Sequence, residues 1–192
     1  MAGIPYFATL IGLELDGELV FGAVHAPALG PGSGILAGQP AGDPAGLRET
    51  WWAARGHGAW GGTGTLPETI RQRRLRVSRT ARVAEAFIVH GGLLQFQKHG
   101  LWPVLSEVVA RAYRTRGFGD WWGHILVAEG RCDAMIEGRV ALHDVAALKP
   151  ILEEAGGVLL ARNNAPLVRG FEEATLSSTP GVVEELSGIL GF

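Results

Sequence analysis

The chain has 192 residues, of which 17 are Lys or Arg and 19 are Asp or Glu, so its formal net charge of −2 gives no basic excess that would indicate a nucleic-acid partner. Apolar residues make up 47% of the sequence, as in ordinary soluble proteins, and no apolar run approaches the roughly 20 residues that a membrane-spanning helix needs. The single cysteine, Cys132, excludes an internal disulfide and fits a cytoplasmic protein. From the charge and the short apolar runs, we expect neither a nucleic-acid partner nor a membrane partner.

A turn motif predicts the first two strands. Asp16-Gly17 separates two runs rich in β-forming residues, 7–15 and 19–24, and an Asp-Gly pair in this setting is a strong signal for a β-hairpin. Residues 28–49 contain Gly and Pro at high density and almost no apolar periodicity, which predicts a long surface loop.

Short strands are expected in the next part of the chain. They cover 51–60, as a strand pair with a Gly-rich turn at 56–58, and then 75–78 and 86–89. From residue 86 onward, helical patterns alternate with strand patterns. Such alternation after a meander of strands favours a mixed α/β or layered α+β fold.

Four helices are expected in the second half, over 101–114, 120–129, 144–157 and from 180 onward. Asp120 and Asp144 are suitable N-cap residues for the second and third helices. Pro150 lies inside the third helix, and because proline removes an N–H and crowds the preceding turn, we expect a kink or an irregular first turn there. Strands are expected at 132–137 and 158–160.

The most informative stretch runs from Ala141 to Gly157 and reads Ala-Leu-His-Asp-Val-Ala-Ala-Leu-Lys-Pro-Ile-Leu-Glu-Glu-Ala-Gly-Gly. It places a carboxylate, Asp144, at a helix N-terminus before small residues that permit close packing. The stretch resembles the inositol monophosphatase family, which carries an aromatic-Asp-x-Ala-Ala segment and a helix ending in Glu-Ala-Gly-Gly. The residue before this aspartate is usually Trp in the family and is His143 here.

Further segments resemble the same family in the same order, at 3–8, 51–60, 75–78, 116–120 and 126–133. Together they cover nearly the whole chain. The resemblance implies a layered αβαβα sandwich that is truncated at its N-terminus, with residues 1–192 forming a single domain and residues 28–49 forming an inserted Gly/Pro-rich loop.

The resemblance also assigns site residues. Asp144 corresponds to a Mg²⁺ ligand, and Glu137 corresponds to an acid that contacts a substrate hydroxyl in the inositol enzymes. Gly119-Asp120 looks most like the histidinol-phosphate phosphatases, and Asp120 or Glu137 could pair with a cationic amine or imidazolium. Arg116 could contact a substrate phosphate or carboxylate. The alternatives are that Asp120 and Asp144 only cap helices and that Arg116 is a surface charge.

Most of the family's metal ligands are missing from the sequence. They come from a glutamate on an upstream helix and from an Asp-Pro-x-Asp-Gly-Thr segment, and neither is present here. The six histidines show no metal-ligand spacing either. Because one carboxylate cannot organise a site for several Mg²⁺ ions, we expect an incomplete chain with little activity alone. In the family, the missing part supplies helices that cover one face of the sheet. Without them, apolar sheet surface should be exposed and favour a homodimer or aggregation.

Two main hypotheses follow. The first is a Mg²⁺-dependent phosphatase of histidine biosynthesis that acts on histidinol phosphate, with inositol phosphate, fructose bisphosphate and nucleotide bisphosphates as rival substrates. The second is a non-catalytic binding or regulatory descendant that pairs with a complete homologue. An unrelated α/β binding module would require every motif match to be accidental.

Overall fold

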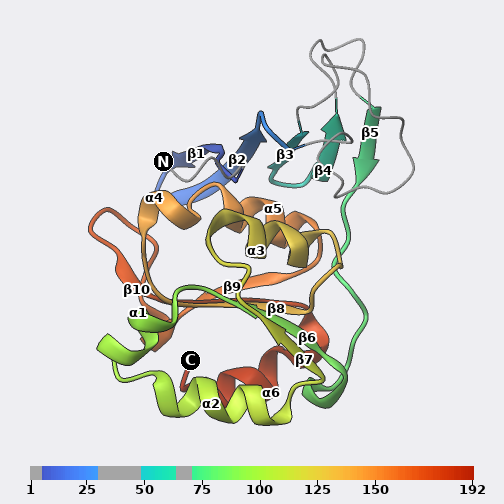
Figure 1. The fold of residues 1–192 in the computed structure, drawn as a ribbon. Coiled ribbons are helices and arrows are strands. Elements are labelled where there is room, and N and C mark those ends of the chain that lie inside the picture. The colour runs from blue at the N-terminus through green and yellow to red at the C-terminus, as the bar shows by residue number, and fades with distance from the viewer. Residues whose placement is uncertain (1–5, 30–48, 64–70) are drawn as a thin grey trace.

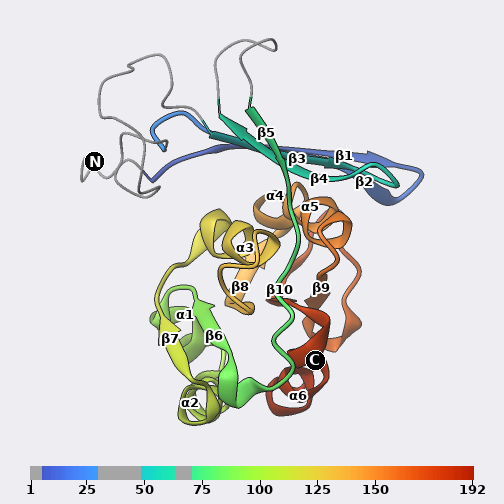
Figure 2. The same ribbon diagram turned by 90° about the vertical axis from the view of Figure 1, so that its right-hand side faces the viewer.

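Two five-stranded sheets and two groups of helices make up the part of the chain that the computed structural model describes, residues 6–29, 49–63 and 71–192 (Figure 1). Sheet A has the order β1-β2-β3-β4-β5, and sheet B has the order β7-β6-β8-β10-β9. Helices α3, α4 and α5 lie between the two sheets, and α1, α2 and α6 cover the other face of sheet B (Figure 2). The layers are therefore sheet, helices, sheet, helices.

Sheet A is an antiparallel meander of consecutive strands. The expected hairpin at Asp16-Gly17 is confirmed, because both residues have the positive φ angles, 53° and 81°, that a tight two-residue turn requires. The strand pair expected over 51–60 is confirmed as well. The strands are β1 Thr9–Leu15, β2 Glu18–Ala26, β3 Glu49–Ala54, β4 Gly58–Thr63 and β5 Arg71–Arg74.

The prediction of a strand at 75–78 is wrong. The last strand of sheet A ends at Arg74, and the following residues form an extended connection between the sheets. Leu75 donates its N–H to the carbonyl of Ala59, whereas Val77 donates to the carbonyl of Ala155. Because these two hydrogen bonds go to different elements, no ladder forms. Most of the loop expected over 28–49 lies outside the described residues.

Sheet B contains parallel and antiparallel neighbours. β7, β6 and β8 run parallel to one another, and β10 is antiparallel to both β8 and β9. The strands expected at 86–89, 132–137 and 158–160 are confirmed with shifted ends. The sequence did not predict β7, which has only three residues, or β10, which carries several polar residues. The strands are β6 Phe87–His90, β7 Arg114–Arg116, β8 Ala134–Ala141, β9 Val158–Ala161 and β10 Glu172–Ser178.

The helices follow the expected order, with one addition and one division. α1 Leu93–Lys98 was not expected, while α2 Trp102–Arg111, α3 Asp120–Ala128 and α6 Pro180–Leu190 confirm three of the predicted helices. None of the helices in the described ranges is long and apolar enough to cross a membrane. Two short 3₁₀ helices occur at Val83–Glu85 and Arg162–Asn164.

The third predicted helix is divided into α4 Leu142–Val145 and α5 Leu148–Glu154. Pro150 is the third residue of α5, in the first turn, where the missing N–H costs no helical hydrogen bond. The expected irregularity is confirmed by the break between α4 and α5 at Ala146 and Ala147, shortly before this proline. Asp144 does not cap the helix from outside, because it is the third residue of α4 and its Oδ2 accepts a hydrogen bond from the N–H of Ala141, 2.9 Å away.

Glycines bring sheet A onto the middle helical layer. A Cβ on Gly22 would overlap the carbonyl oxygen of Ala147, and a Cβ on Gly12 would lie 2.9 Å from the Cβ of Ala146. The backbones of β1 and β2 therefore touch the α4–α5 junction directly. Trp51 and Leu148, with 2% and 0% of their surface exposed, fill the apolar core between the sheets beside this contact.

The outer face of sheet A is apolar and uncovered in the described part of the chain. Because Gly12 faces the helices, its neighbours Ile11 and Leu13 face outward, with 58% and 53% of their surface exposed. Figure 2 shows no described helix on this side of the sheet. The structure therefore contains four of the five layers in the expected αβαβα order, and an apolar surface lies where the first helical layer would be.

Replacing Gly22 tests the backbone contact between β2 and α5. We expect Gly22→Ala to lower the free energy of unfolding by about 3 kcal/mol, because the added methyl group meets backbone that cannot move aside. Gly188→Ala is the matched control, since its Cβ enters open space on helix α6 and should stabilise the protein by about 0.5–1 kcal/mol. Urea unfolding measures both, and a Gly22→Ala variant as stable as the unmodified chain would contradict the contact.

Candidate active site

The candidate site lies where the three parallel strands of sheet B end. β6, β7 and β8 run in the same direction, so the segments that follow them meet at one edge of the sheet, which is where ligands bind in many α/β proteins. The Gly91-Gly92 turn follows β6, and the 117–119 turn follows β7. β8 continues past its last partner on β6 and carries Glu137 into the same space.

Glu137 is the central group of the site. Only 6% of its surface is exposed, and its Oε1 accepts a hydrogen bond from the backbone N–H of Asp120 at 3.0 Å. A Cβ on Gly91 would overlap Oε2 of Glu137, so glycine at this position lets the carboxyl group lie directly against the turn. The pKa of Glu137 is raised to about 7, mainly by burial; the negative charges of Asp120 and Asp144 contribute to the rise, and the hydrogen bond from the Asp120 N–H opposes it.

Two turns enclose that carboxyl group by close backbone contact. A Cβ on Gly119 would lie 2.9 Å from the Cα of Gly91, so the turns after β6 and β7 touch. Gly91 is held in place by its N–H, which donates to the carbonyl of Ile136 at 3.0 Å. The sequence analysis did not assign these glycines to the site, although their position directly after strands was a signal.

Tyr6 connects the start of the described chain to the same site. Its hydroxyl donates to the carbonyl of Gly119, and its ring stacks on Trp121 with a centroid separation of 5.5 Å. Burial raises the pKa of the Tyr6 hydroxyl, and the nearby charges of Asp120 and Glu137 contribute. Tyr6 is therefore a further residue of the site that the sequence analysis did not single out.

Asp120 is not the N-cap of α3. Gly119 occupies that position, and Asp120 is the first helical residue with a φ of 54°. Positive φ is strained for a residue other than glycine, by roughly 1 kcal/mol or more, and such strain often marks functional sites. Glu137 binds the N–H of Asp120, and the Asp120 side chain is exposed at the rim beside it.

Asp144 and Arg116 lie further out. Half of the Asp144 side chain, 49%, is exposed, and its Oδ1 is 3.5 Å from Nε2 of His143. Arg116 is exposed at the end of β7, and its Nη1 donates to the carbonyl of Thr115 at 2.7 Å. The structure thus places Glu137 within electrostatic range of both Asp120 and Asp144, whereas Arg116 forms no ion pair with an acid of the described ranges.

These carboxylates do not fit a complete magnesium site. Within residues 6–29, 49–63 and 71–192, no three His, Cys, Asp or Glu side chains come together as metal ligands. Mg²⁺ requires near-octahedral oxygen coordination, and one Asp144 oxygen already accepts a backbone hydrogen bond. His124 is no ligand candidate, because it is 2% exposed and its Nδ1 pairs with Oγ of Ser177 at 2.7 Å. Burial lowers its pKa to about 3.

A family model described as the inositol monophosphatase family matches residues 1–188. The chain belongs to this family. It is 34% identical over 183 residues to a histidinol-phosphatase of Mycobacterium tuberculosis, covering 95% of the chain and 61% of that protein. It is 31% identical over 168 residues to a histidinol-phosphatase of Streptomyces coelicolor, covering 85% of the chain and 55% of that protein.

Solved structures of the family share the fold. An inositol monophosphatase from Zymomonas mobilis superposes with a TM-score of 0.75 at 21% identity, covering 97% of this chain and 63% of that one. The chain therefore has the inositol monophosphatase fold over almost its whole length. It spans less than two thirds of the length of these three family members.

The buried Glu137 carboxyl predicts a pH-dependent stability. Its pKa rises from an ordinary value of 4.5 to about 7 on folding, so between these values the folded chain holds a proton that the unfolded chain has lost. The contribution of this group to the free energy of unfolding is fully present below about pH 4.5 and is lost as the pH rises to about 7. In Glu137→Gln this loss disappears. Relative to the unmodified chain, the free energy of unfolding of the variant should therefore rise by up to about 3 kcal/mol between about pH 4 and pH 8.

Thermal or urea unfolding at several pH values measures this shift. Glu107→Gln is the control, because Glu107 lies on the surface of α2 in an exposed pair with Arg111. Its difference from the unmodified chain should stay within about 0.5 kcal/mol at every pH. A Glu137→Gln difference that does not change with pH would show that folding does not shift the pKa of this carboxyl group.

Proposed function

We propose that this chain carries the substrate-recognition part of a Mg²⁺-dependent phosphate-monoester hydrolase that acts on histidinol phosphate. The observation that supports this most is the buried Glu137 carboxyl beside the exposed Asp120 carboxylate, at the carboxyl ends of parallel strands. Two carboxyl groups in this arrangement suit a cationic amine or imidazolium. The similarity to histidinol-phosphatases, at 31% and 34% identity, supports the same substrate.

Glu137 has a defined role in this proposal. The N–H of Asp120 fixes one of its oxygens, and Gly91 packs against the other, so the carboxyl group is held in one orientation before the ligand binds. With a pKa of about 7, it is only partly ionised at neutral pH. A bound cation would favour the ionised form, so binding of the amine should release a proton and strengthen as the pH rises through 7.

The metal part of the reaction requires further groups. Mg²⁺ would polarise the phosphate and activate water in such a hydrolase, and Asp144 is the one residue of this chain that we assign to it. The carboxylates of the described residues do not form a complete site, and the sequence has no Asp-Pro-x-Asp-Gly-Thr segment. We therefore propose that these 192 residues bind the substrate but hydrolyse it poorly by themselves.

The assembly around the site is also part of the proposal. The two apolar clusters lie on opposite faces of sheet B, which supports a single domain over residues 1–192. The exposed face of sheet A, with Ile11 and Leu13, supports association with another polypeptide or with a second copy in a homodimer. The role of residues 28–49 as an insertion remains a prediction.

Ligand binding without metal tests the recognition part. Histidinol, which has no phosphate to hydrolyse, should bind the chain saturably in an NMR or calorimetric titration. Glu137→Gln and Asp120→Asn should each weaken it at least about tenfold, or by about 1.4 kcal/mol. Glu107→Gln should bind like the unmodified chain. Tighter binding of inositol than of histidinol, or equal binding by all variants, would contradict the substrate assignment.

Phosphate release tests the catalytic part. With Mg²⁺ and histidinol phosphate, the chain alone should show no turnover above background. Joining it to the portion of the Mycobacterium tuberculosis histidinol-phosphatase that lies outside the matched region should restore turnover, and Asp144→Asn should abolish it again. Turnover by the chain alone at roughly 1 per second or more would contradict the proposal. Failure of the fusion, with histidinol binding intact, would favour a non-catalytic binding or regulatory role.

A further inference from the structure

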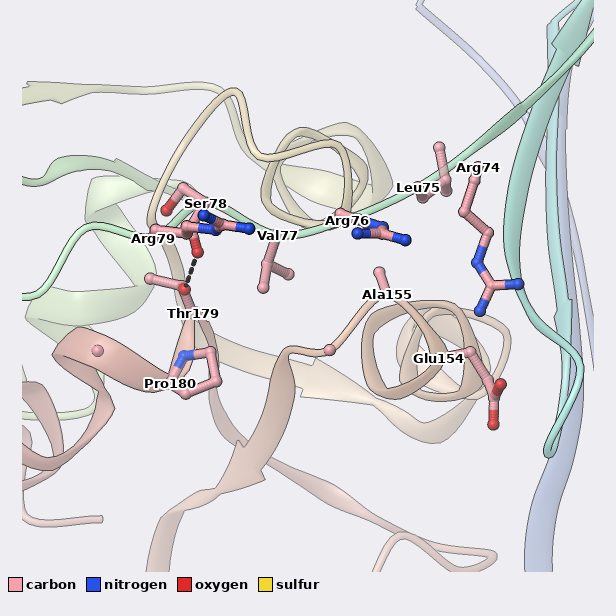
Figure 3. A pocket seen from close by; sticks show the side chains of 12 residues that line it. Arg74, Leu75, Arg76, Val77, Ser78, Arg79, Glu154, Ala155, Thr179 and Pro180 are labelled. Atoms are coloured by element: carbon pink, nitrogen blue, oxygen red, sulfur yellow. Dashed lines mark hydrogen bonds between the residues drawn. The ribbon is translucent and has the colours of Figure 1, made fainter.

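A hollow lies away from the candidate active site. It has a volume of about 510 Å³ and is formed by the connection 74–79, the end of α5 with the residues after it, and the start of α6 (Figure 3). We call it the arginine groove, because Arg74, Arg76 and Arg79 lie along one side of it. Glu154, Ala155 and Pro180 lie on the opposite side.

The arginine groove is at the other edge of sheet B from Glu137. Ser178, the last residue of β10, pairs with Ala134, the first residue of β8, and the groove residues Thr179–Gly181 follow directly. The candidate active site lies further along β8, where Glu137 follows the residues that pair with β6. The lining of the groove includes none of Asp120, Glu137 and Asp144, so a ligand of the groove would be separate from the substrate.

The charge of the groove is unbalanced. Arg76 and Arg79 are exposed, and neither forms an ion pair within the described ranges. Arg74 lies over the ring of Trp60, with 5.1 Å between its Cζ and the ring centroid. Among the described residues that line the groove, Glu154 is the one acid, and its oxygens accept hydrogen bonds from the backbone N–H groups of Gly56 and Gly58.

The walls of the groove are fixed by hydrogen bonds between distant segments. Val77 donates its N–H to the carbonyl of Ala155 at 3.0 Å, and Oγ1 of Thr179 donates to the carbonyl of Ser78 at 2.7 Å. The hydroxyl of Ser78 in turn donates to Oδ1 of Asp133. Because these contacts already order the backbone of all three segments, a ligand would not have to order it.

We propose that the arginine groove binds the phosphate group of a small organic ligand other than the substrate. Arg76 and Arg79 supply planar guanidinium groups, which form paired hydrogen bonds with phosphate oxygens. Val77, Ala155 and Pro180 supply an apolar surface beside them for the organic part of the ligand. The proposal requires neither the metal nor the substrate of the proposed function, so the two can be tested separately.

Phenylphosphonate is a suitable probe, because it carries a phosphonate dianion and an apolar ring but no ester bond to hydrolyse. In metal-free buffer, its titration into the chain, followed by NMR or calorimetry, should show saturable binding at millimolar concentration or below. Arg76→Gln and Arg79→Gln should each weaken binding at least about tenfold. Arg169→Gln, which removes an exposed arginine outside the groove, should bind the probe as the unmodified chain does.

Two further titrations test whether the apolar surface takes part in binding and whether the probe binds in the groove or in the candidate active site. Methylphosphonate, which lacks the ring, should bind more weakly than phenylphosphonate because it cannot contact the apolar surface, and equally tight binding would contradict an organic ligand. Asp120→Asn should leave phenylphosphonate binding unchanged, because that residue belongs to the candidate active site. The proposal is overturned if binding does not saturate, if Arg76→Gln and Arg79→Gln bind as tightly as Arg169→Gln, or if Asp120→Asn removes binding. Thermal unfolding of each variant verifies that it is folded.

Discussion

A carboxyl group held out of water at the end of a β-sheet is the feature on which the candidate site depends. Burying Glu137 costs free energy, and the hydrogen bond from the Asp120 N–H offsets only part of that cost, because the pKa of Glu137 still rises to about 7. Within the described ranges, no lysine or arginine pairs with this carboxyl group. A buried acid without a structural counter-charge is typical of a binding or catalytic site.

The rest of the fold supports that arrangement through backbone contacts. Gly91 and Gly119 bring the turns after β6 and β7 together, and this leaves space for the Glu137 side chain. At the other side of the helical layer, Gly22 brings β2 against Ala147, which fixes sheet A on the α4–α5 junction beside Asp144. Small residues at these positions thus connect the packing of the layers to the position of the acidic side chains.

The sequence predicted the parts that local patterns determine. The Asp16-Gly17 hairpin and the Pro180 start of α6 depend on the backbone preferences of a few neighbouring residues, and both were confirmed. The motif around Asp144 led to the family and to most of the acidic residues of the site. The strand predicted at 75–78 was wrong because Ala59 and Ala155, which are distant in sequence, accept its hydrogen bonds.

Features that combine distant segments could not be predicted in this way. The interpretation of Asp120 as a simple cap failed because Gly119 takes the cap position, while Glu137, 17 residues away, binds the Asp120 N–H. Tyr6 reaches the carbonyl of Gly119 across a separation of 113 residues. The arginine groove is built from three segments, at 74–79, 154–156 and 179–181, so the sequence shows its arginines but not the space between them.

The central claim is that this chain contains the recognition part of a phosphatase site without a complete metal part. A calorimetric titration of the chain with Mg²⁺, in the absence of substrate, tests that claim most directly. We expect no stoichiometric binding tighter than the millimolar range, because Asp144 lacks partner carboxylates in the described part of the chain. Tight stoichiometric binding that Asp144→Asn abolishes would contradict the claim and show that the chain forms a working metal site.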